Sequence, residues 1–418
     1  MNKQVSHIPS GYKPSPLGII PEDWEVKRLG EVGEVFSGGT PNTEIQEYWN
    51  GNIDWCTPTD ITLLNGAVYI ERTALKITDL GLKSSSAVLL PPNSIIVCTR
   101  ATIGNAAISL HQIATNQGFK NIVPNENIDT LFLYYTIVNN KIRLIRLGNG
   151  STFLEVSKSD FENLTIPVPP LPEQQRIVSV LSLWDTAIAK QTALIEKLTL
   201  RKRGLMQQLL TGKTRLKGLE REWKNIKLGS IAERITRKNE EDNKNVVTIS
   251  AQRGFVVQTG FFNKSVASEI LDGYFLVHKD EFCYNKSYSN GYPMGAIKRL
   301  KSFDKAVVTT LYICFRLKEK PQTNIDFFEQ YCESGLLNKE LVKVANEGGR
   351  AHGLLNVTPS DFFNMHMSVP SINEQNAIAL VLVTADKEIE LANEKLARLQ
   401  EEKRGLMQVL LTGKKRVK

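Results

Sequence analysis

The stretch that decides the fold reads VPPLPEQQRI at residues 168–177 and KRGLMQQLLTGK at residues 202–213. Both parts return 201 residues later, as VPSINEQNAI at 369–378 and KRGLMQVLLTGK at 403–414, and the alignment needs no gap. Self-similarity at so long a period indicates a duplicated domain rather than a solenoid of short repeats. The sequence therefore predicts two halves built on one plan.

Each copy predicts one long helix with apolar residues at alternating spacings of four and three. Three prolines place its start near Glu173, whose charge suits a helix N-terminus, and Gly212 supplies the stop. A 3.5-residue repeat sustained this far favours a partner helix in a left-handed coiled coil over two unrelated surface helices. The predicted seam residues are Ile177, Leu181, Trp184, Ile188, Ile195, Leu198, Leu205 and Leu209, and Ile378, Leu382, Ile389, Leu396, Leu399, Leu406 and Leu410. Both helices carry a lysine late in the seam, Lys202 and Lys403.

Composition bounds the class of protein. The chain of 418 residues can hold two or three domains. Its formal charge of +8 favours a polyanionic partner, but only weakly, because many proteins with such an excess bind none. No apolar run is long enough to span a membrane, and prolines interrupt the N-terminus, which is therefore no signal peptide. The scattered cysteines are typical of reduced, buried thiols in a cytoplasmic protein: Cys56, Cys98, Cys283, Cys314 and Cys332.

The rest of the chain follows the same duplicated plan. We predict a first globular domain at 1–163, with an extended arm at 1–20, a central helix at 164–215, a second domain at 216–366 and a C-terminal helix at 367–418. Strands are predicted at 94–99, 246–250 and 306–315, and helices at 129–147 and 325–344. The helices and the boundary segments of the two halves match, while the residues between them differ. This suggests that the two halves recognise two different targets.

Further short motifs appear in a fixed order along this frame. Residues 24–32 open the first half, followed by GGTP at 38–41, TRATIGN at 99–105, TNQGF at 115–119 and GNGST at 148–152. The PxxxEQ motif then opens each helix, at Pro169 and Pro370. In this order the chain resembles the specificity subunits of type I restriction-modification systems over essentially its whole length.

The resemblance implies an α+β fold, with two pseudo-symmetric α/β target-recognition domains joined by two long antiparallel coiled-coil helices. Each domain of that family reads one half of an asymmetric, bipartite site in double-stranded DNA. The helix pair sets the spacer and docks two modification subunits, which methylate adenine, and restriction subunits then join. S-adenosylmethionine, ATP and magnesium are accordingly expected in the partner subunits, with no cofactor in this chain.

The second half departs from the family pattern. Its loop at 346–353 replaces GNGST, and it has no counterpart of TNQGF. The contacts of the second domain are therefore less well defined by sequence than those of the first.

A catalytic site of the chain's own is the alternative, as a DNA-binding methyltransferase or nuclease. Residues 36–40 narrowly miss the glycine-rich loop for S-adenosylmethionine, and Gly212 to Thr214 resembles only the end of a phosphate loop. The five histidines are isolated, without metal-ligand spacing. We therefore expect a non-catalytic recognition subunit without a metal site. A coiled-coil adaptor with no DNA role is a further hypothesis.

The chemistry that remains is binding. Arginine can bridge guanine, asparagine and glutamine can bridge adenine, and lysine can contact phosphates. The candidates in the first half are Thr99, Arg100, Thr102, Asn105, Asn116, Gln117, Lys120, Asn149, Ser151 and Thr152. Those in the second half are Arg253, Asn285, Lys286, Ser287, Tyr288, Arg350 and His352. The DNA sequence and spacer length that they would read do not follow from the sequence.

Overall fold

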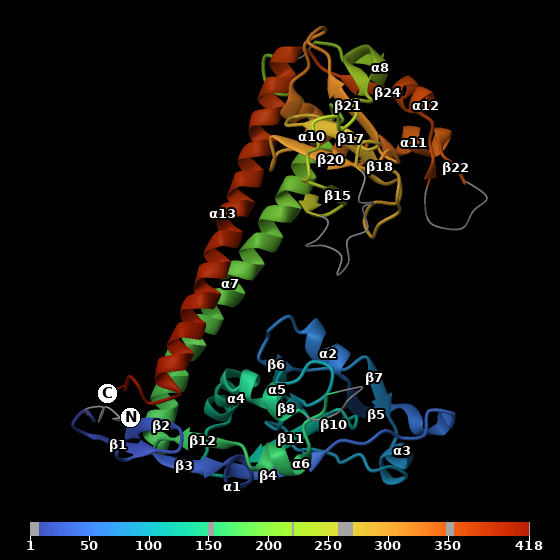
Figure 1. Ribbon diagram of the computed structural model, residues 1–418. Helices are drawn as coiled ribbons and strands as arrows, with labels where there is room; N and C mark the ends of the chain where they lie inside the picture. The colour runs from blue at the N-terminus through green and yellow to red at the C-terminus, as the bar shows by residue number, and fades with distance from the viewer. Residues whose placement is uncertain (1–7, 149–153, 220, 258–270, 348–354, 418) are drawn as a thin grey trace. The chain divides into compact units, whose positions relative to one another are not determined.

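The computed structural model describes residues 8–148, 154–219, 221–257, 271–347 and 355–417 (Figure 1). The chain divides into two compact units. The first consists of Met1–Gln191 with Lys395–Lys418, and the second of Thr192–Glu394. Each unit therefore contains one α/β domain, one part of the long helix α7 (Leu171–Leu209) and one part of the long helix α13 (Ile372–Leu410).

The first α/β domain is built around a mixed sheet of five strands in the order β4-β11-β8-β9-β6. A three-stranded sheet, β10-β5-β7, and the pairs β1-β2 and β3-β12 complete it. Its strands are β1 Tyr12–Ser15, β2 Gly18–Pro21, β3 Glu25–Arg28, β4 Gly33–Ser37, β5 Trp49–Cys56, β6 Tyr69–Ile70, β7 Leu75–Ile77, β8 Ile95–Cys98, β9 Ala106–Ser109, β10 Ile113–Thr115, β11 Phe119–Pro124 and β12 Thr165–Val168. Its helices are α1 Leu29–Val32, η1 Gln46–Tyr48, α2 Pro58–Leu63, α3 Asp79–Lys83, α4 Thr130–Asn139, α5 Lys141–Leu147 and α6 Lys158–Glu162.

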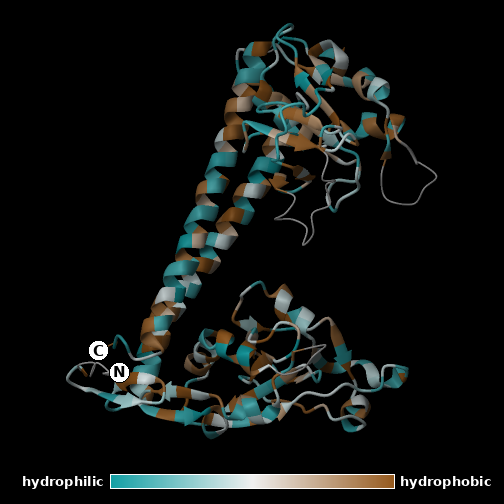
Figure 2. Ribbon diagram, viewed as in Figure 1, coloured by the Kyte–Doolittle hydropathy of each residue, from teal (hydrophilic) through white to brown (hydrophobic). Residues whose placement is uncertain are grey.

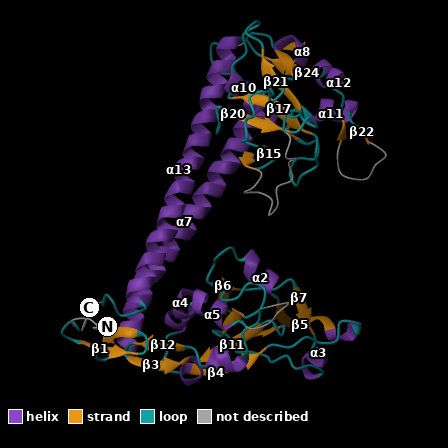
Figure 3. Ribbon diagram, viewed as in Figure 1, coloured by secondary structure: helices purple, strands orange, loops and turns teal. Residues whose placement is uncertain are grey.

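The second α/β domain has a four-stranded sheet in the order β14-β21-β18-β19 and the pairs β13-β24, β15-β16, β17-β20 and β22-β23. Its strands are β13 Lys224–Lys227, β14 Ala232–Ile235, β15 Val247–Ser250, β16 Gly254–Val257, β17 Phe275–His278, β18 Phe282–Asn285, β19 Ala296–Arg299, β20 Lys305–Val308, β21 Ile313–Leu317, β22 Asn346–Glu347, β23 Leu355–Asn356 and β24 His366–Val369. Its helices are α8 Leu228–Ile231, α10 Ile325–Glu333, α11 Asn338–Val344 and α12 Pro359–Asn364. Figure 3 shows short helices beside the strands of each domain.

The two domains share one frame. In both, the strand that opens the domain pairs with the strand that precedes a long helix: β3 with β12, and β13 with β24. The helix before that last strand is capped in the same way, because Ser157 accepts from the backbone N–H of Asp160 and Thr358 from that of Asp361. The duplication read from the sequence is thus a duplication of structure.

Within each unit the two long helices lie antiparallel. In the first unit Asp185 of α7 pairs with Lys403 of α13. In the second unit Lys202 of α7 pairs with Asp386 of α13, so residue numbers rise along one helix as they fall along the other. This confirms the predicted architecture of two α/β domains with an antiparallel helix pair.

The helix pair buries the predicted seam. Every predicted seam residue of the two helices is buried or half-buried. By contrast, Leu183 and Leu380, which lie off the seam, are 71% and 70% exposed. Figure 2 shows hydrophobic and hydrophilic residues alternating along both helices. The apolar seam therefore faces a partner, as a 3.5-residue repeat requires.

The helix ends differ slightly from the prediction. Helix α7 begins at Leu171 rather than near Glu173, and Pro172 lies inside its first turn. A proline is tolerated there because the N–H groups of a first turn have no partner within the helix. Gly212 follows the end of α7 with φ +70°, and Gly413 follows α13 with φ +71°, so both serve as helix stops.

Three predicted elements are interrupted. The predicted helix 129–147 breaks at Asn140 into α4 and α5, and 325–344 breaks into α10 and α11 around Gly335, which has φ +75°. The predicted strand 306–315 is two strands in different sheets, because the backbone turns at Thr309 to Tyr312. The predicted extended arm instead contains the β1-β2 hairpin, from which Ile20 enters the core.

The cores of the domains include the ends of the long helices. In the first unit Ile177 and Leu181 of α7 and Leu410 of α13 share one hydrophobic cluster with Phe132 and Tyr135 of α4. In the second unit the equivalent cluster joins both helices to phenylalanines of α10 and of the four-stranded sheet. Apolar burial therefore attaches each α/β domain to the helix pair.

Candidate nucleic-acid interface

The predicted contact residues of the first domain gather beyond the end of strand β8. Three segments meet there: residues 99–105 after β8, residues 116–120 around the start of β11, and residues 154–156. The backbone N–H of Thr99 donates to the carbonyl of Gly118 at 2.8 Å, and the N–H of Val156 donates to the carbonyl of Thr99 at 3.0 Å. Backbone bonds thus hold the three segments together.

Arg100 is the most prominent cation of this cluster. Its guanidinium group donates to Glu155 through Nε at 3.1 Å and also through Nη2. The side chain remains 42% exposed, so Glu155 orients the group without covering it. Lys120 is only 6% exposed and lies 3.5 Å from the other oxygen of Glu155. Burial alone would raise the pKa of Glu155, but Arg100 and Lys120 together lower it below its usual value.

The other candidates of the first domain have mixed surroundings. Thr99 is fully buried, and its hydroxyl donates to the carbonyl of Gly118, so a structural role accounts for it. Asn116 accepts from the N–H of Gly118 and shapes the turn before β11. Asn105 accepts from Lys141 at 2.7 Å. Thr102 is half-buried, and Gln117 is exposed and hydrogen-bonded to Thr40. Base contact by any of them stays a prediction.

The second domain repeats this arrangement with different side chains. Asn285, Lys286, Ser287 and Tyr288 follow strand β18, the counterpart of β8. The amide of Asn285 donates to the carbonyl of Ile249 at 3.2 Å and its oxygen accepts from the N–H of Ser287. Tyr288 is 65% exposed. Burial lowers the pKa of Lys286.

The segment after the divergent loop closes both clusters. In the second domain the N–H of Leu355 donates to the carbonyl of Lys286, as that of Val156 donates to Thr99 in the first. The loops themselves lie outside the described residues, and with them the candidates Asn149, Ser151, Thr152, Arg350 and His352. Arg253 is exposed at the turn before β16.

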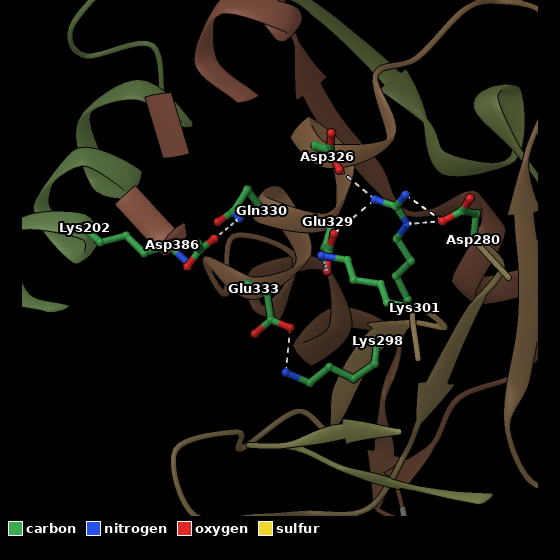
Figure 4. Close-up of polar contacts among 10 residues, drawn as sticks. Lys202, Asp280, Lys298, Lys301, Asp326, Glu329, Gln330, Glu333 and Asp386 are labelled. Atoms are coloured by element: carbon green, nitrogen blue, oxygen red, sulfur yellow. Dashed lines mark hydrogen bonds and ion pairs between the residues drawn. The ribbon is translucent and has the colours of Figure 1, made fainter. Parts of the chain in front are cut away.

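A cleft of about 900 Å³ lies in the second unit between α7 and the second domain. Its lysines are paired with carboxylates of the same unit, as Figure 4 shows: Lys202 with Asp386, Lys298 with Glu333 at 2.6 Å, and Lys301 with Glu329 at 2.7 Å. These pairs largely cancel the positive charge of the cleft. The cleft is therefore a weaker phosphate site than its lysine content suggests.

The glutamate of the PxxxEQ motif bonds to segments outside its own helix, in addition to lying in the first turn of that helix. Glu173, 1% exposed, accepts from Trp24 at 3.0 Å and from both Nε and Nη2 of Arg416, which follows α13. Glu374, also 1% exposed, accepts from Nε and Nη2 of Arg215, which follows α7, at 2.7 and 2.8 Å. Each glutamate thus ties the start of one long helix to the segment after the other.

The glutamine of the motif holds the adjacent α/β domain. Gln174 accepts from the N–H of Asp129, the N-cap of α4, at 2.9 Å, and donates to the carbonyl of Pro169. Gln375 accepts from the N–H of Asn324, the N-cap of α10, at 3.0 Å, and donates to the carbonyl of Pro370. Sequence reasoning recognised the motif but did not predict these contacts, because the partner lies about 50 residues away in the chain.

The near-matches to catalytic loops have structural roles. A Cβ at Gly38 would lie 1.9 Å from the carbonyl oxygen of Asn116, and one at Gly39 would lie 2.3 Å from the backbone nitrogen of Ala87. This glycine pair is therefore packed against the chain's own backbone. Across the described ranges, no three His, Cys, Asp or Glu side chains gather to hold a metal ion. None of the helices in those ranges is long and apolar enough to cross a bilayer.

Comparison with known proteins gives a consistent result. Residues 21–200 match the family model of the type I restriction modification DNA specificity domain. The MjaIX specificity subunit of Methanocaldococcus jannaschii is 39% identical over 194 residues, which cover 45% of each chain. The EcoR124I/EcoR124II specificity subunit of Escherichia coli is 31% identical over 42% of this chain and 44% of its own. The chain thus spans about half the length of these two relatives.

More distant relatives match along the full length. The MjaVIII specificity subunit of the same archaeon is 25% identical over 96% of this chain and 94% of its own. Among solved structures, the S subunit of a type I restriction-modification system from M. genitalium has a TM-score of 0.51 at 16% identity, covering 93% of this chain and 96% of its own. A chain from a structure on the assembly and conformational transition of a type I system has a TM-score of 0.55 at 17% identity, covering 94% and 99%. These structures share the fold.

Proposed function

We propose that the chain is the specificity subunit of a type I restriction-modification system and that it selects the DNA site of such a system. Each α/β domain reads one half of an asymmetric, bipartite site in double-stranded DNA, and the chain itself performs no chemistry. We call these two α/β domains the recognition domains.

One observation carries this proposal. The two recognition domains share their frame, but the polar side chains beyond β8 and β18 differ. The first domain has Arg100, which is hydrogen-bonded to Glu155. The second domain has Asn285, Lys286 and the exposed Tyr288. A duplicated frame with different polar ends fits two different half-sites, because side-chain donors and acceptors discriminate base edges.

The helix pair supports a proposal about partners. Apolar side chains lie exposed on its outer surface, where the seam does not cover them: Leu183, Leu194, Leu200, Leu380, Val383 and Leu391. Exposed apolar side chains of this kind are typical of protein interfaces when they form patches. We infer that two modification subunits dock on the helices and that restriction subunits join through them, in the cytoplasm. S-adenosylmethionine, ATP and magnesium then belong to those subunits.

Mapping methylated adenines across the genome tests the proposal. Cells that carry the full system are compared with cells in which this gene alone is deleted. We expect one bipartite motif, methylated only when the gene is present, and a mobility shift of the assembled complex on duplexes with that motif. A complex that binds random and site-bearing duplexes equally would contradict the proposal and favour the adaptor. Saturable binding of S-adenosylmethionine to the isolated chain would favour an enzyme.

A further inference from the structure

Asp185 of α7 and Asp386 of α13 occupy equivalent positions in the duplicated frame, 201 residues apart. Each carboxylate bonds to the other long helix and also to the recognition domain of its own unit. One side chain therefore connects three elements in each unit, and the arrangement occurs twice in the chain. We call these two sites the first and the second junction.

The first junction is formed by Asp185, Lys403 and Tyr135. One oxygen of Asp185 pairs with Nζ of Lys403, and the other accepts from the hydroxyl of Tyr135 on α4. Nζ of Lys403 also lies 4.8 Å from the centre of the Tyr135 ring, within the range of a cation–π contact. Tyr135 is only 1% exposed, and burial together with the bond to Asp185 raises its pKa, so its hydroxyl stays a donor.

The second junction repeats the first with a different donor. One oxygen of Asp386 pairs with Nζ of Lys202, and the other accepts from Nε2 of Gln330 on α10 at 2.6 Å (Figure 4). Gln330 is 5% exposed, and its own oxygen is buried without a partner among the described residues. The side-chain amide of Gln330 therefore bonds to Asp386 through its nitrogen, while its oxygen has no hydrogen-bond partner among the described residues. Asp386 is the more exposed of the two aspartates, because it lines the cleft.

Directionality distinguishes these junctions from the surrounding apolar packing. Apolar contacts attach each domain to the helices, but such contacts tolerate small rotations and shifts because they are not directional. A charged hydrogen bond holds its two atoms at a fixed distance and angle. Lys202 and Lys403 also interrupt the apolar seam, which weakens the coil unless a carboxylate pairs with them. Buried polar groups of this kind can fix register and orientation at some cost in stability.

We propose that Asp185 and Asp386 are positioning residues that fix the orientation of each recognition domain on the helix pair. This inference rests on the proposed function: a site of two half-sites is read at one separation only if neither domain can rotate on its support. The junctions contact no base. They determine which spacer length the complex accepts.

The first test uses the full chain assembled with its modification subunits. Duplexes carry both half-sites intact, with the native spacer or with one base pair added or removed. For D185N and D386N we expect the preference for the native spacer over the altered spacers to fall about tenfold, the effect of one charged hydrogen bond. The preference for the bases within each half-site should stay as in the wild type. Unchanged spacer selectivity in both variants would overturn the proposal.

The matched control is E388Q. Glu388 lies on the same helix as Asp386 and pairs across the helices with Arg201, but both side chains are about half exposed. Among the described residues, neither side chain has a hydrogen bond or ion pair to a recognition domain. We expect its spacer selectivity to equal that of the wild type. A second variant, K202M/D386L, replaces the pair with apolar groups and preserves the helix pair. It should fold and yet lose selectivity as D386N does.

A second measurement does not depend on DNA. Spin labels are attached in the second unit through K339C on α11 and E390C on α13, both exposed positions. Double electron–electron resonance should give one narrow distance distribution for the wild type and E388Q, and a broadened one for D386N. An unchanged distribution in D386N would contradict the positioning role. If the wild-type complex prefers no DNA site, the proposed function fails, while these distances still decide the role of Asp386.

Discussion

Arg100 is the side chain whose setting most resembles that of a base-reading residue. Glu155 fixes its guanidinium group while leaving it 42% exposed. Replacing Arg100 with lysine keeps the charge but removes the two-pronged donor that bridges guanine. We expect R100K to weaken binding to the native site by about 1–3 kcal/mol and to relax the base preference at one position, measured by competition between duplexes.

The exposed Lys83 of α3 supplies the matched control for Arg100. K83A should lower affinity little and alter no base preference, because it lies outside the cluster beyond β8. A base preference in R100K identical to that of the wild type would contradict the reading role of Arg100.

The carboxylate of Glu155 makes the first domain sensitive to acid. Its pKa in the folded chain is lowered below the ordinary 4.5 by Arg100 and Lys120, against the effect of burial. A carboxyl with a lowered pKa stabilises the fold above its unfolded pKa, and this contribution disappears as the pH falls through its folded pKa. Because solvent screens the ion pair, the free energy of unfolding of the wild type should exceed that of E155Q by only about 0.5 kcal/mol at neutral pH.

Urea unfolding of wild type and E155Q across the acid range measures this difference. The two free energies of unfolding should converge as the pH falls below 4.5. Two curves that stay parallel down to the lowest pH would show that the ion pair contributes nothing.

At the level of elements, the glutamates of the PxxxEQ motif hold the ends of the long helices together. Glu374 is 1% exposed and accepts two bonds from Arg215. E374Q removes the carboxylate charge that pairs with the guanidinium group of Arg215, whose side chain is 25% exposed, and this should cost about 1.5–3 kcal/mol in the free energy of unfolding, the range for a hydrogen bond to a charged group. E233Q, which breaks the exposed pair with Arg316, should cost less than about 0.5 kcal/mol in the same assay. If E374Q and E233Q lowered the free energy of unfolding equally, the motif glutamate would have no special role in joining the helix ends.

The seam allows an equally direct comparison within one helix. Leu382 is fully buried, whereas Leu380, two residues before it, is 70% exposed. L382A should destabilise the chain by about 2–5 kcal/mol, because it removes buried methyl groups and leaves a cavity. L380A should leave the thermal unfolding curve nearly unchanged. A similar loss of stability in both variants would mean that the seam faces another direction than described.

The sequence predicted the elements of the helix pair better than those of the domains. A heptad pattern and two glycine stops determine the helices through local rules, so their ends were wrong by only a few residues. Strand 306–315 was wrong because an apolar run does not reveal a turn stabilised by Thr309. The junction aspartates were missed, although a lysine inside an apolar seam indicates that a carboxylate must lie opposite. Residue spacing alone does not reveal which carboxylate.

For the whole molecule, the duplication is the property on which the proposed function depends. Helices α7 and α13 each run without interruption from one unit into the other, and each unit contains one recognition domain. The DNA sequence that the chain is proposed to read depends on where individual polar side chains are placed, which no local pattern in the sequence encodes. The frame was therefore predictable and the recognised DNA sequence was not.

The paired helices, we propose, set the separation at which the two recognition domains read DNA. Inserting one heptad after Gln191 in α7 and one after Glu394 in α13 keeps the seam in register and lengthens the pair by about 10 Å. The spacer of the methylated site, mapped in cells with the altered complex, should then grow by about three base pairs, or methylation should cease. An unchanged spacer with full methylation would contradict the role of the helices as a ruler.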